Sequence, residues 1–408
     1  MKRSLPILAA ALALLPVLLT LALGGPALAD AAPPLEPPCG DLAPTGETQV
    51  QMAAETVLLE VHAPATVRVR AEFTLRNQGT AEERMAVRFP LEDPSGRGDG
   101  YGQFPEVEHF AVTARGDALT WRIIEEAFRE GDPPITWAAF DVAFPPGQDV
   151  QLVVSYETGL TGYGPGIGPA SVYYVLETGA GWHGPIGRAD LIVRLPYPAG
   201  PENVFAGYQA PPDRSFVDGE ARWHWEDLEP THNDNFWLRL VWPEDWQRLV
   251  AARGALEAQP GDAPAAVELA EASRIAGSDR KGFVASEELA GLAQATIEQA
   301  LASQPDAAEL HAELAAILLW RLPYSAGTAD PGLPRIRSEL ARALALEPQN
   351  ARALQVREEL EARFGPTPTA APVADASLAG VSGWVYLVVL PSIAMALMAY
   401  IGLRRRRG

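Results

Sequence analysis

The chain has 408 residues, of which 48% are hydrophobic and 21% charged, and its formal net charge at pH 7 is −20. This composition excludes a wholly disordered chain, and a single cysteine excludes a disulfide-stapled scaffold or a cysteine-based zinc or iron–sulfur site. The acidic balance also argues against nucleic acid as a partner, because binding a polyphosphate needs a basic surface.

The N-terminus has the pattern of a secretory signal peptide. Met1-Lys2-Arg3 is basic, the stretch from Leu5 to Leu23 is apolar, and Ala27-Leu28-Ala29 supplies the small residues of a cleavage site. We therefore expect a signal peptide at 1–29 and a mature chain that begins at Asp30. An uncleaved membrane anchor is the alternative.

A proline-rich lead follows at 30–47 and contains the lone cysteine, Cys39. Glu36-Pro37-Pro38 precedes the cysteine, whereas a lipidated cysteine follows small residues directly, so we do not expect lipidation. The thiol could form an intermolecular disulfide, but an inert free thiol in an extended lead is the simpler expectation.

Between residues 48 and 242 the dominant hydrophobic period is two. From Val67 to Arg76, apolar residues alternate with charged or polar ones, which predicts a strand with one buried and one solvated face. The same alternation recurs in short stretches at Arg84–Phe89, Phe140–Phe144, Val150–Tyr156, Ala189–Leu195 and Phe236–Trp242. Short strands separated by proline and glycine predict an antiparallel β-sandwich over 48–242.

Two aromatic motifs lie in the second half of this stretch. One runs Trp182-His183-Gly184-Pro185-Ile186-Gly187-Arg188-Ala189, and the other runs from Trp223-His224-Trp225 to Glu229-Pro230-Thr231. Together they resemble a bacterial extracytoplasmic β-sandwich family of unknown function, in which a W-x-G-x-I-G-x-A turn and a W-x-W-x-x-x-E-P-T segment recur. The resemblance covers about residues 48–242. It implies a surface or envelope location and no catalytic residues.

The aromatic side chains of these motifs have two interpretations. Trp182, Trp223 and Trp225 are large apolar bodies suited to packing in the core or at a corner of a sandwich. Exposed on a sheet rim, the same three rings would form a platform for a ligand such as a carbohydrate. Packing is the simpler expectation.

Histidines near these motifs are weak candidates for a metal site. His183, His224 and His232 are the right ligand type, with Glu229 and Asp234 nearby in the sequence. No HExxH or H-x-H spacing is present, and in a strand His224 points away from the face of Trp223 and Trp225. We therefore expect no metal, and no cofactor motif is found.

From residue 246 to 364 the hydrophobic period changes to 3.6. Proline recurs just after expected helix ends, at Pro260, Pro305 and Pro348. This spacing resembles a tetratricopeptide-repeat array, with inserts at Ser278–Glu288 and Pro323–Leu333 that lengthen the repeat unit. A plain helical bundle is the alternative.

The C-terminus predicts a membrane anchor. Residues 365–380 are rich in Pro, Thr and Ala and are expected to form an extended stalk. Trp384–Leu403 has no charge and the length of a transmembrane helix, and the basic tail at 404–408 predicts a cytoplasmic end. The expected fold class is thus multidomain: an antiparallel β-sandwich, an α-helical repeat-like domain and one C-terminal transmembrane helix.

No motif for a nucleophile or a phosphate-binding loop is found. We therefore expect a non-enzymatic interaction protein of the cell membrane, single-pass with its N-terminus outside, whose partner is a protein or a cell-envelope polymer. The alternative is an envelope hydrolase acting on wall polymer through a histidine-based metal site or through acids drawn from Glu177, Glu226, Asp227 and Glu229, which would have to face each other across a cleft.

Overall fold

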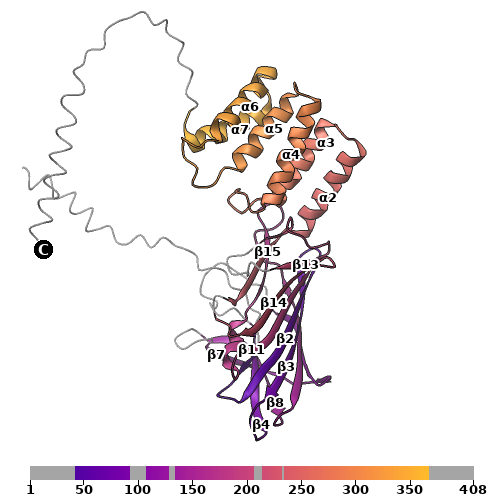
Figure 1. The fold of residues 1–408 in the computed structure, drawn as a ribbon, viewed down its shortest axis with the longest axis vertical. Helices are drawn as coiled ribbons and strands as arrows, with labels where there is room; N and C mark the ends of the chain where they lie inside the picture. Colours follow the sequence, from indigo (N-terminus) through magenta and orange to yellow (C-terminus); the bar gives the residue numbers. More distant parts are fainter. Residues whose placement is uncertain (1–41, 92–106, 128–133, 206–213, 232–233, 367–408) are drawn as a thin grey trace, which may run out of the picture. The chain divides into compact units, whose positions relative to one another are not determined.

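The computed structural model describes residues 42–91, 107–127, 134–205, 214–231 and 234–366 (Figure 1). The predicted signal peptide, Cys39 and His232 lie outside the described residues. By the density of its internal contacts, the chain divides into one compact unit of residues 1–360 and a second of residues 361–408. The described strands, and the helices up to Leu360, belong to the first unit.

The described strands form three sheets. The largest contains β2 (Val50–His62), β3 (Thr66–Asn77), β5 (Glu108–Ala114), β6 (Asp117–Ala118), β9 (Asp149–Gly159), β11 (Ile186–Arg194), β13 (Ser215–Val217) and β14 (Glu220–Leu228). The second contains β1 (Ala43–Pro44), β4 (Glu83–Pro90), β7 (Arg122–Ala127) and β8 (Pro134–Phe144). The third contains β10 (Ala170–Tyr174), β12 (Val204–Phe205) and β15 (Phe236–Leu240).

The eight-stranded sheet has the order β13-β14-β11-β2-β3-β9-β5-β6, and the smaller sheets have the orders β1-β4-β8-β7 and β10-β15-β12. The inner faces of all three sheets contribute to one hydrophobic core, which includes Phe73 of β3, Phe140 of β8 and Leu238 of β15. In β3 every second residue from Val67 to Leu75 is buried, which confirms the strand predicted from the alternating pattern.

The predicted fold class is wrong on the direction of the strands. The large sheet is mixed, because β11 runs parallel to β2, with Leu191 opposite Val57. The other described strand pairs, such as β2 with β3, are antiparallel. Alternation in a sequence reports which side chains are buried but not which strand lies next to which, so the antiparallel arrangement did not follow from it.

Strand β2 contains a bulge that changes which of its faces is buried. The register between β2 and β3 shifts between Met52 and Ala54, so that inward positions pass from even-numbered to odd-numbered residues. Glu55 is thereby turned into the core, where it is 1% exposed and accepts a 2.9 Å hydrogen bond from the hydroxyl of Tyr174. Bulges that re-aim a side chain in this way are a common device of β proteins.

Helices follow the last strand. They are α2 (Pro243–Ala258), α3 (Ala263–Ala276), α4 (Glu287–Ser303), α5 (Ala308–Trp320), α6 (Leu333–Leu346) and α7 (Ala351–Phe364). The Asp262 carboxylate caps α3 by accepting from the Ala265 N–H, and the Ser286 hydroxyl caps α4 by accepting from the Leu289 N–H. Pro260, Pro305 and Pro348 each lie two residues beyond a helix end, where proline cannot continue the helix.

Consecutive helices pack against each other through small and aliphatic side chains. Ala270 of α3, Ala293 and Ile297 of α4, and Leu314 of α5 lie in one buried cluster. The predicted inserts coincide with the two long connections, residues 277–286 between α3 and α4 and residues 321–332 between α5 and α6. Both connections lie between helices, and neither breaks a helix in its interior.

The second correction concerns the membrane. Among the helices of residues 243–366, none is both long and apolar enough to cross a bilayer. The longest, α4, has 17 residues, whereas a span requires about 20 apolar ones. Trp384–Leu403 lies outside the described residues, and the predicted C-terminal transmembrane helix is not supported.

Candidate functional site

A glycine-rich connection between β9 and β10 presents two exposed hydrophobic side chains. Gly162, Gly164, Gly166 and Gly168 all have positive φ values, between 79° and 134°. Only glycine adopts such values without strain, so every second residue of this loop is restricted to it. Between the glycines, Tyr163 is 54% exposed and Ile167 is 55% exposed.

The loop is held in place by hydrogen bonds to its backbone. The Gly166 N–H donates to the Asp245 carboxylate at 2.9 Å, and the Trp242 indole N–H donates to the Gly168 carbonyl at 3.1 Å. Asp245 is buried, and burial raises the pKa of its carboxyl, an effect that the Gly166 N–H opposes. The two side chains that bind this loop, Trp242 and Asp245, therefore both lie at the start of α2.

Gly168 also permits a close approach of a second loop. A Cβ atom at this position would lie 2.8 Å from the backbone nitrogen of Arg280 and 3.2 Å from the carbonyl carbon of Asp279. A side chain of any size would push the two backbones apart. The glycine thus places the connection between β9 and β10 directly against residues 279–280.

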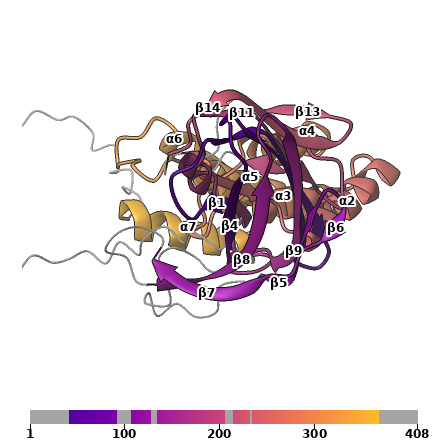
Figure 2. The same ribbon diagram turned by 90° about the horizontal axis from the view of Figure 1, so that it is seen from below.

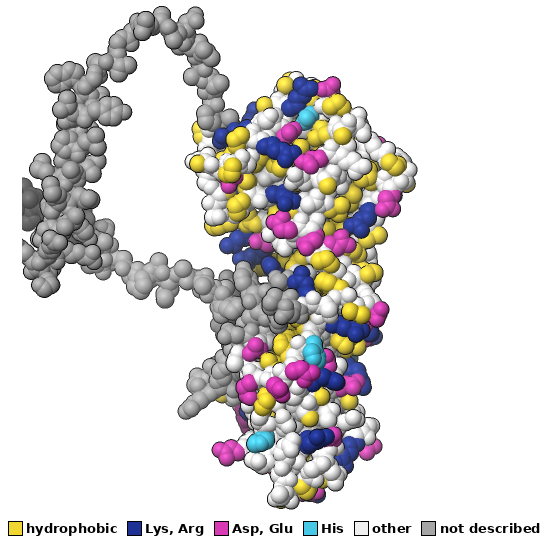
Figure 3. Space-filling view, viewed as in Figure 1, with side chains coloured by type: hydrophobic (Ala, Val, Ile, Leu, Met, Phe, Trp, Pro, Cys, Tyr) yellow, Lys and Arg dark blue, Asp and Glu magenta, His cyan; other side chains and the backbone are white. Residues whose placement is uncertain are grey.

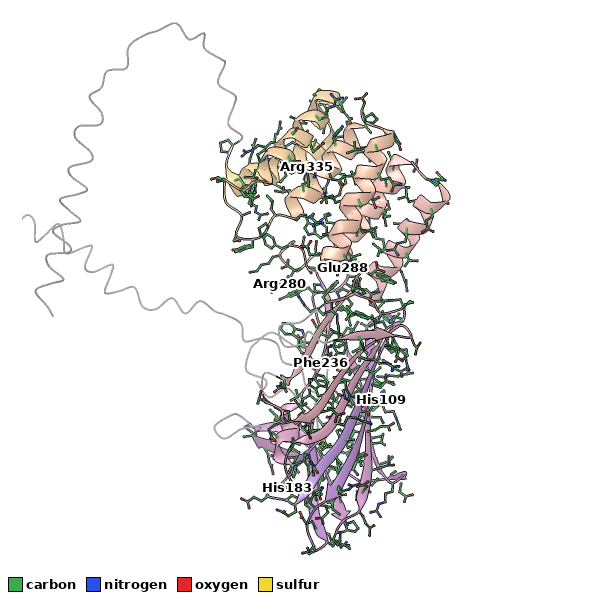
Figure 4. The ribbon with its side chains drawn as sticks, in the orientation of Figure 1. His109, His183, Phe236, Arg280, Glu288 and Arg335 are labelled. Atoms are coloured by element: carbon green, nitrogen blue, oxygen red, sulfur yellow. The ribbon has the colours of Figure 1, made fainter. Side chains whose placement is uncertain are left out.

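The loop between α3 and α4 turns around one carboxylate. Asp279 Oδ1 accepts hydrogen bonds from the backbone N–H groups of Lys281 and Phe283, each at 2.8 Å. Gly282 adopts a φ of 79°, which completes the turn. The Asp279 carboxylate is thus engaged by the backbone, whereas the side chains of Arg280, labelled in Figure 4, and of Lys281 are exposed.

Three loops meet through these side chains. Arg280 donates to the Tyr163 hydroxyl, and its guanidinium carbon is 4.9 Å from the centroid of the Tyr163 ring. The Lys281 ammonium is 5.8 Å from the ring centroid of Tyr324, which lies edge-on to Phe283 with centroids 5.1 Å apart. We call the resulting patch the aromatic–basic surface; it consists of Tyr163, Ile167, Arg280, Lys281, Phe283 and Tyr324.

The positive charges of this surface are available to a partner. Within the part of the chain that the structure describes, neither Arg280 nor Lys281 forms an ion pair with a carboxylate. By contrast, Arg321 and Arg335 nearby are paired with Glu287 and Glu298. On the face shown in Figure 3, acidic and basic side chains lie interspersed over the helices and strands.

The composition of the aromatic–basic surface is that of an interface core. It contains three of the seven large hydrophobic side chains that are exposed in the described residues, Tyr163, Ile167 and Tyr324. Tyrosine and arginine are enriched among the residues that dominate binding energy in protein interfaces. Its chemistry suits the binding of carboxylates beside apolar groups.

The tryptophans singled out in the sequence lie mainly in the core. Trp182 is 4% exposed, and its indole N–H donates to the Leu42 carbonyl at 2.8 Å. Trp223 is 2% exposed and lies edge-on to Phe236, with ring centroids 4.8 Å apart. Trp225 is partly buried and packs against the same core. All three rings therefore contribute buried area to the core, and Trp225 is the least completely buried of them.

His183 and His224 are not brought together, and His232 lies outside the described residues. His183 is exposed at the end of the strands that lies far from Arg280 in Figure 4. His224 lies on the outer face of β14, opposite Trp223 and Trp225, with Nδ1 2.7 Å from Asp190 and Nε2 3.0 Å from Glu226. Among residues 42–366, outside their undescribed gaps, no group of three or more His, Cys, Asp or Glu side chains could hold a metal ion.

The acids of the alternative hydrolase hypothesis lie on different elements. Glu177 begins the short 3-10 helix η2 (Glu177–Gly181) and is partly buried. Glu226 is on the outer face of β14 beside His224, and Asp227 and Glu229 are exposed at and just beyond the end of that strand. The structure pairs Glu226 with a histidine and places Glu177 on an element separate from the other three acids.

The pKa of His224 offers a test of this outer-face cluster. The hydrogen bond to Asp190 is the largest cause that raises the pKa of His224, and Glu226 adds to it. Because the pKa of His224 is raised in the folded state, protonated His224 stabilises the fold through its carboxylate partners. This contribution is fully present below the ordinary histidine pKa of about 6.5 and is lost as pH rises through the raised pKa.

We expect Asp190→Asn to lower the pKa of His224, measured by NMR titration of the imidazole protons. Asp141→Asn, on the second sheet, is the control, and an unchanged pKa in Asp190→Asn would contradict the assignment.

Sequence reasoning missed the aromatic–basic surface. Arg280 and Tyr163 are 117 residues apart, and the contact between them depends on how the two loops pack. The alternating glycines from Gly162 to Gly168 were the available signal, since such a pattern indicates close backbone packing. The second signal was the length of the two inserts between helices, which carry Arg280, Lys281, Phe283 and Tyr324.

Comparisons with known proteins give no family. No family model matches the chain, and no curated protein matches it. Among solved structures, a "putative nutrient binding protein" from Legionella pneumophila is 17% identical with a TM-score of 0.43, covering 76% of this chain and 98% of that one. An M1 zinc metallopeptidase from Deinococcus radiodurans is 14% identical with a TM-score of 0.26, covering 79% of this chain and 89% of that one. These likenesses are too distant to support a function.

Proposed function

We propose that this chain is a non-enzymatic binding protein of the extracytoplasmic space, which recognises a polypeptide segment with acidic and apolar side chains through its aromatic–basic surface. The observation that carries the proposal is the pair of cations, Arg280 and Lys281, which lie over tyrosine rings at an exposed site and have no described carboxylate partner. The basic and apolar N-terminus with its Ala27-Leu28-Ala29 site supports export.

Charge complementarity supports an acidic partner. A carboxylate that approaches Arg280 or Lys281 gains a charge-assisted hydrogen bond without breaking an existing ion pair. The exposed rings of Tyr163 and Tyr324 supply apolar area beside the two cations. A neutral cell-envelope polysaccharide would contact the tyrosine rings but would gain little from the cations. The effect of removing the two positive charges on binding therefore distinguishes an acidic polypeptide from a neutral polysaccharide.

The test is binding of the purified full chain to an immobilised glutamate–tyrosine copolymer. We expect measurable, salt-sensitive binding that falls at least tenfold in the variant Arg280→Glu/Lys281→Glu. The matched control is Arg357→Glu, which reverses an exposed charge on α7 and should leave binding unchanged.

Three outcomes would count against the proposal. The first is no binding of the copolymer by the unmodified chain, and the second is equal binding by the double variant. The third is equal or tighter binding to single-stranded DNA or to a neutral wall polysaccharide, because neither of these offers carboxylates beside apolar side chains.

A further inference from the structure

Strand β7 is an exposed edge of the four-stranded sheet. It pairs with β8 along its whole length, from Arg122 opposite Ala139 to Ala127 opposite Pro134, and it is the last strand in the order β1-β4-β8-β7 (Figure 2). Four of its six residues are exposed, and Ile123 is 64% exposed. No described strand pairs with its other side, so within the described residues one row of its backbone donors and acceptors has no strand partner.

The outermost strands at the other ends of the described sheets are shorter or buried, although β6 and β1 pair with only two residues each of β5 and β4. The edge strands β1, β6 and β12 have two residues each, and β13 has three. The five residues of β10 are all buried. β7 contains neither proline nor lysine, and its register with β8 has no bulge. Its charged residues, Arg122, Glu125 and Glu126, discourage unspecific pairing at this edge, so a strand that pairs with it must carry complementary charges.

The sequence of β7 is complementary to itself. Arg122 and Glu126 lie two residues on either side of Ile124. If two copies pair antiparallel with Ile124 opposite Ile124, each Arg122 lies opposite the Glu126 of the other copy. Because residues 122, 124 and 126 share one face of the strand, two ion pairs then flank an isoleucine contact.

Both charged side chains have partners within the chain, which pairing with a second copy would share or replace. Arg122 lies 3.1 Å from Asp141, but both side chains are more than half exposed, and exposed ion pairs of this kind contribute little. Glu126 is held by Arg88, whose guanidinium lies 4.5 Å from the centroid of the Trp137 ring. The carboxylate of Glu126 is thus positioned near the edge and is 49% exposed.

We infer that β7 is a self-association edge: a second copy of this chain adds its own β7 antiparallel, centred on Ile124, to join two four-stranded sheets into one. This inference is independent of the proposed binding function, since β7 contributes no residue to the aromatic–basic surface. A strand from another protein is the competing occupant, and it would not require complementarity between Arg122 and Glu126.

The test is sedimentation equilibrium of the purified full chain over a wide range of concentration. We expect a monomer–dimer equilibrium whose dissociation constant rises at least tenfold in Arg122→Glu and in Glu126→Arg, because each variant places like charges opposite each other. Arg115→Glu, at an exposed position that immediately follows β5, is the matched control and should dimerise normally. Circular dichroism checks that each variant is folded.

Two rescue experiments test the register. The double variant Arg122→Glu/Glu126→Arg should regain the affinity, since it restores opposite charges in swapped positions. An equimolar mixture of the two single variants should form a heterodimer for the same reason. A chain that stays monomeric at all concentrations, single variants that dimerise normally, or a mixture that does not associate would each overturn the inference.

Discussion

Replacing Trp223 by alanine is expected to lower the free energy of unfolding by about 3–5 kcal/mol, the usual cost of removing a large aromatic side chain from a core. Trp223 is 2% exposed on β14 and packs edge-on against Phe236, so no solvent can replace the lost contacts without entering the core. Urea denaturation of the full chain, followed by tryptophan fluorescence and circular dichroism, measures the change.

The control for this variant is His183→Ala, which truncates an exposed side chain and should stay within about 0.5 kcal/mol of the unmodified chain. If the tryptophans formed an exposed platform, Trp223→Ala would instead unfold normally and lose retention on wall polysaccharide. If His183 belonged to a metal site, both His183→Ala and a chelator would lower the melting temperature, because metal binding contributes to folding.

The second large effect is expected at the ion pair between α5 and α7. Arg352 donates to both carboxylate oxygens of Glu313, at 2.8 and 3.4 Å, and Glu313 is only 4% exposed as a side chain. Burial is the largest single influence on Arg352 and lowers its pKa, but the hydrogen bond to Glu313 and the negative charges of Glu313, Glu359 and Glu271 together outweigh it. The pKa of the guanidinium is therefore raised. Arg352→Ala leaves the Glu313 carboxylate buried without this partner and should cost about 3–5 kcal/mol.

Two comparisons make this prediction specific. Arg342→Ala removes a partner of the exposed pair with Asp306 and should cost less than about 1 kcal/mol. Replacing both buried partners, in Glu313→Leu/Arg352→Met, should recover most of the loss, because no unpaired charge remains in the interior. Thermal unfolding followed at 222 nm reports on the helices. A cost of Arg352→Ala no larger than that of Arg342→Ala would contradict the prediction.

Local patterns in the sequence predicted several strands and the ends of three helices, but few of the neighbours of these elements. Alternation from Val67 to Leu75 identified β3, and the prolines at 260, 305 and 348 marked the ends of α2, α4 and α6. Both signals arise within one element, from the faces of a strand or from the missing N–H of proline. The parallel pairing of β2 with β11 depends on residues more than 130 positions apart, and no local pattern reports it.

The bulge in β2 was readable in principle. Val50 and Met52 are buried at even positions, whereas Val57, Leu59 and Val61 are buried at odd positions, and a strand can change parity only by inserting a residue. The candidate site is a different case. The contact of Arg280 with Tyr163 requires two loops to meet, and their packing depends on Gly168 and on the hydrogen bond to Asp245.

Arg280, Lys281, Phe283 and Tyr324 all lie in connections between helices. The side chains that hold α3, α4 and α5 together come mainly from the helices themselves, although Val284 of residues 277–286 also packs against this cluster. If these residues bind a partner as proposed, substitutions at the exposed tips would alter partner preference at small thermodynamic cost, as substitutions do in antibody loops carried on a rigid framework. Descendants of such a chain could diverge rapidly in specificity while their architecture stayed the same, with the glycines at 162–168 as the positions least free to vary.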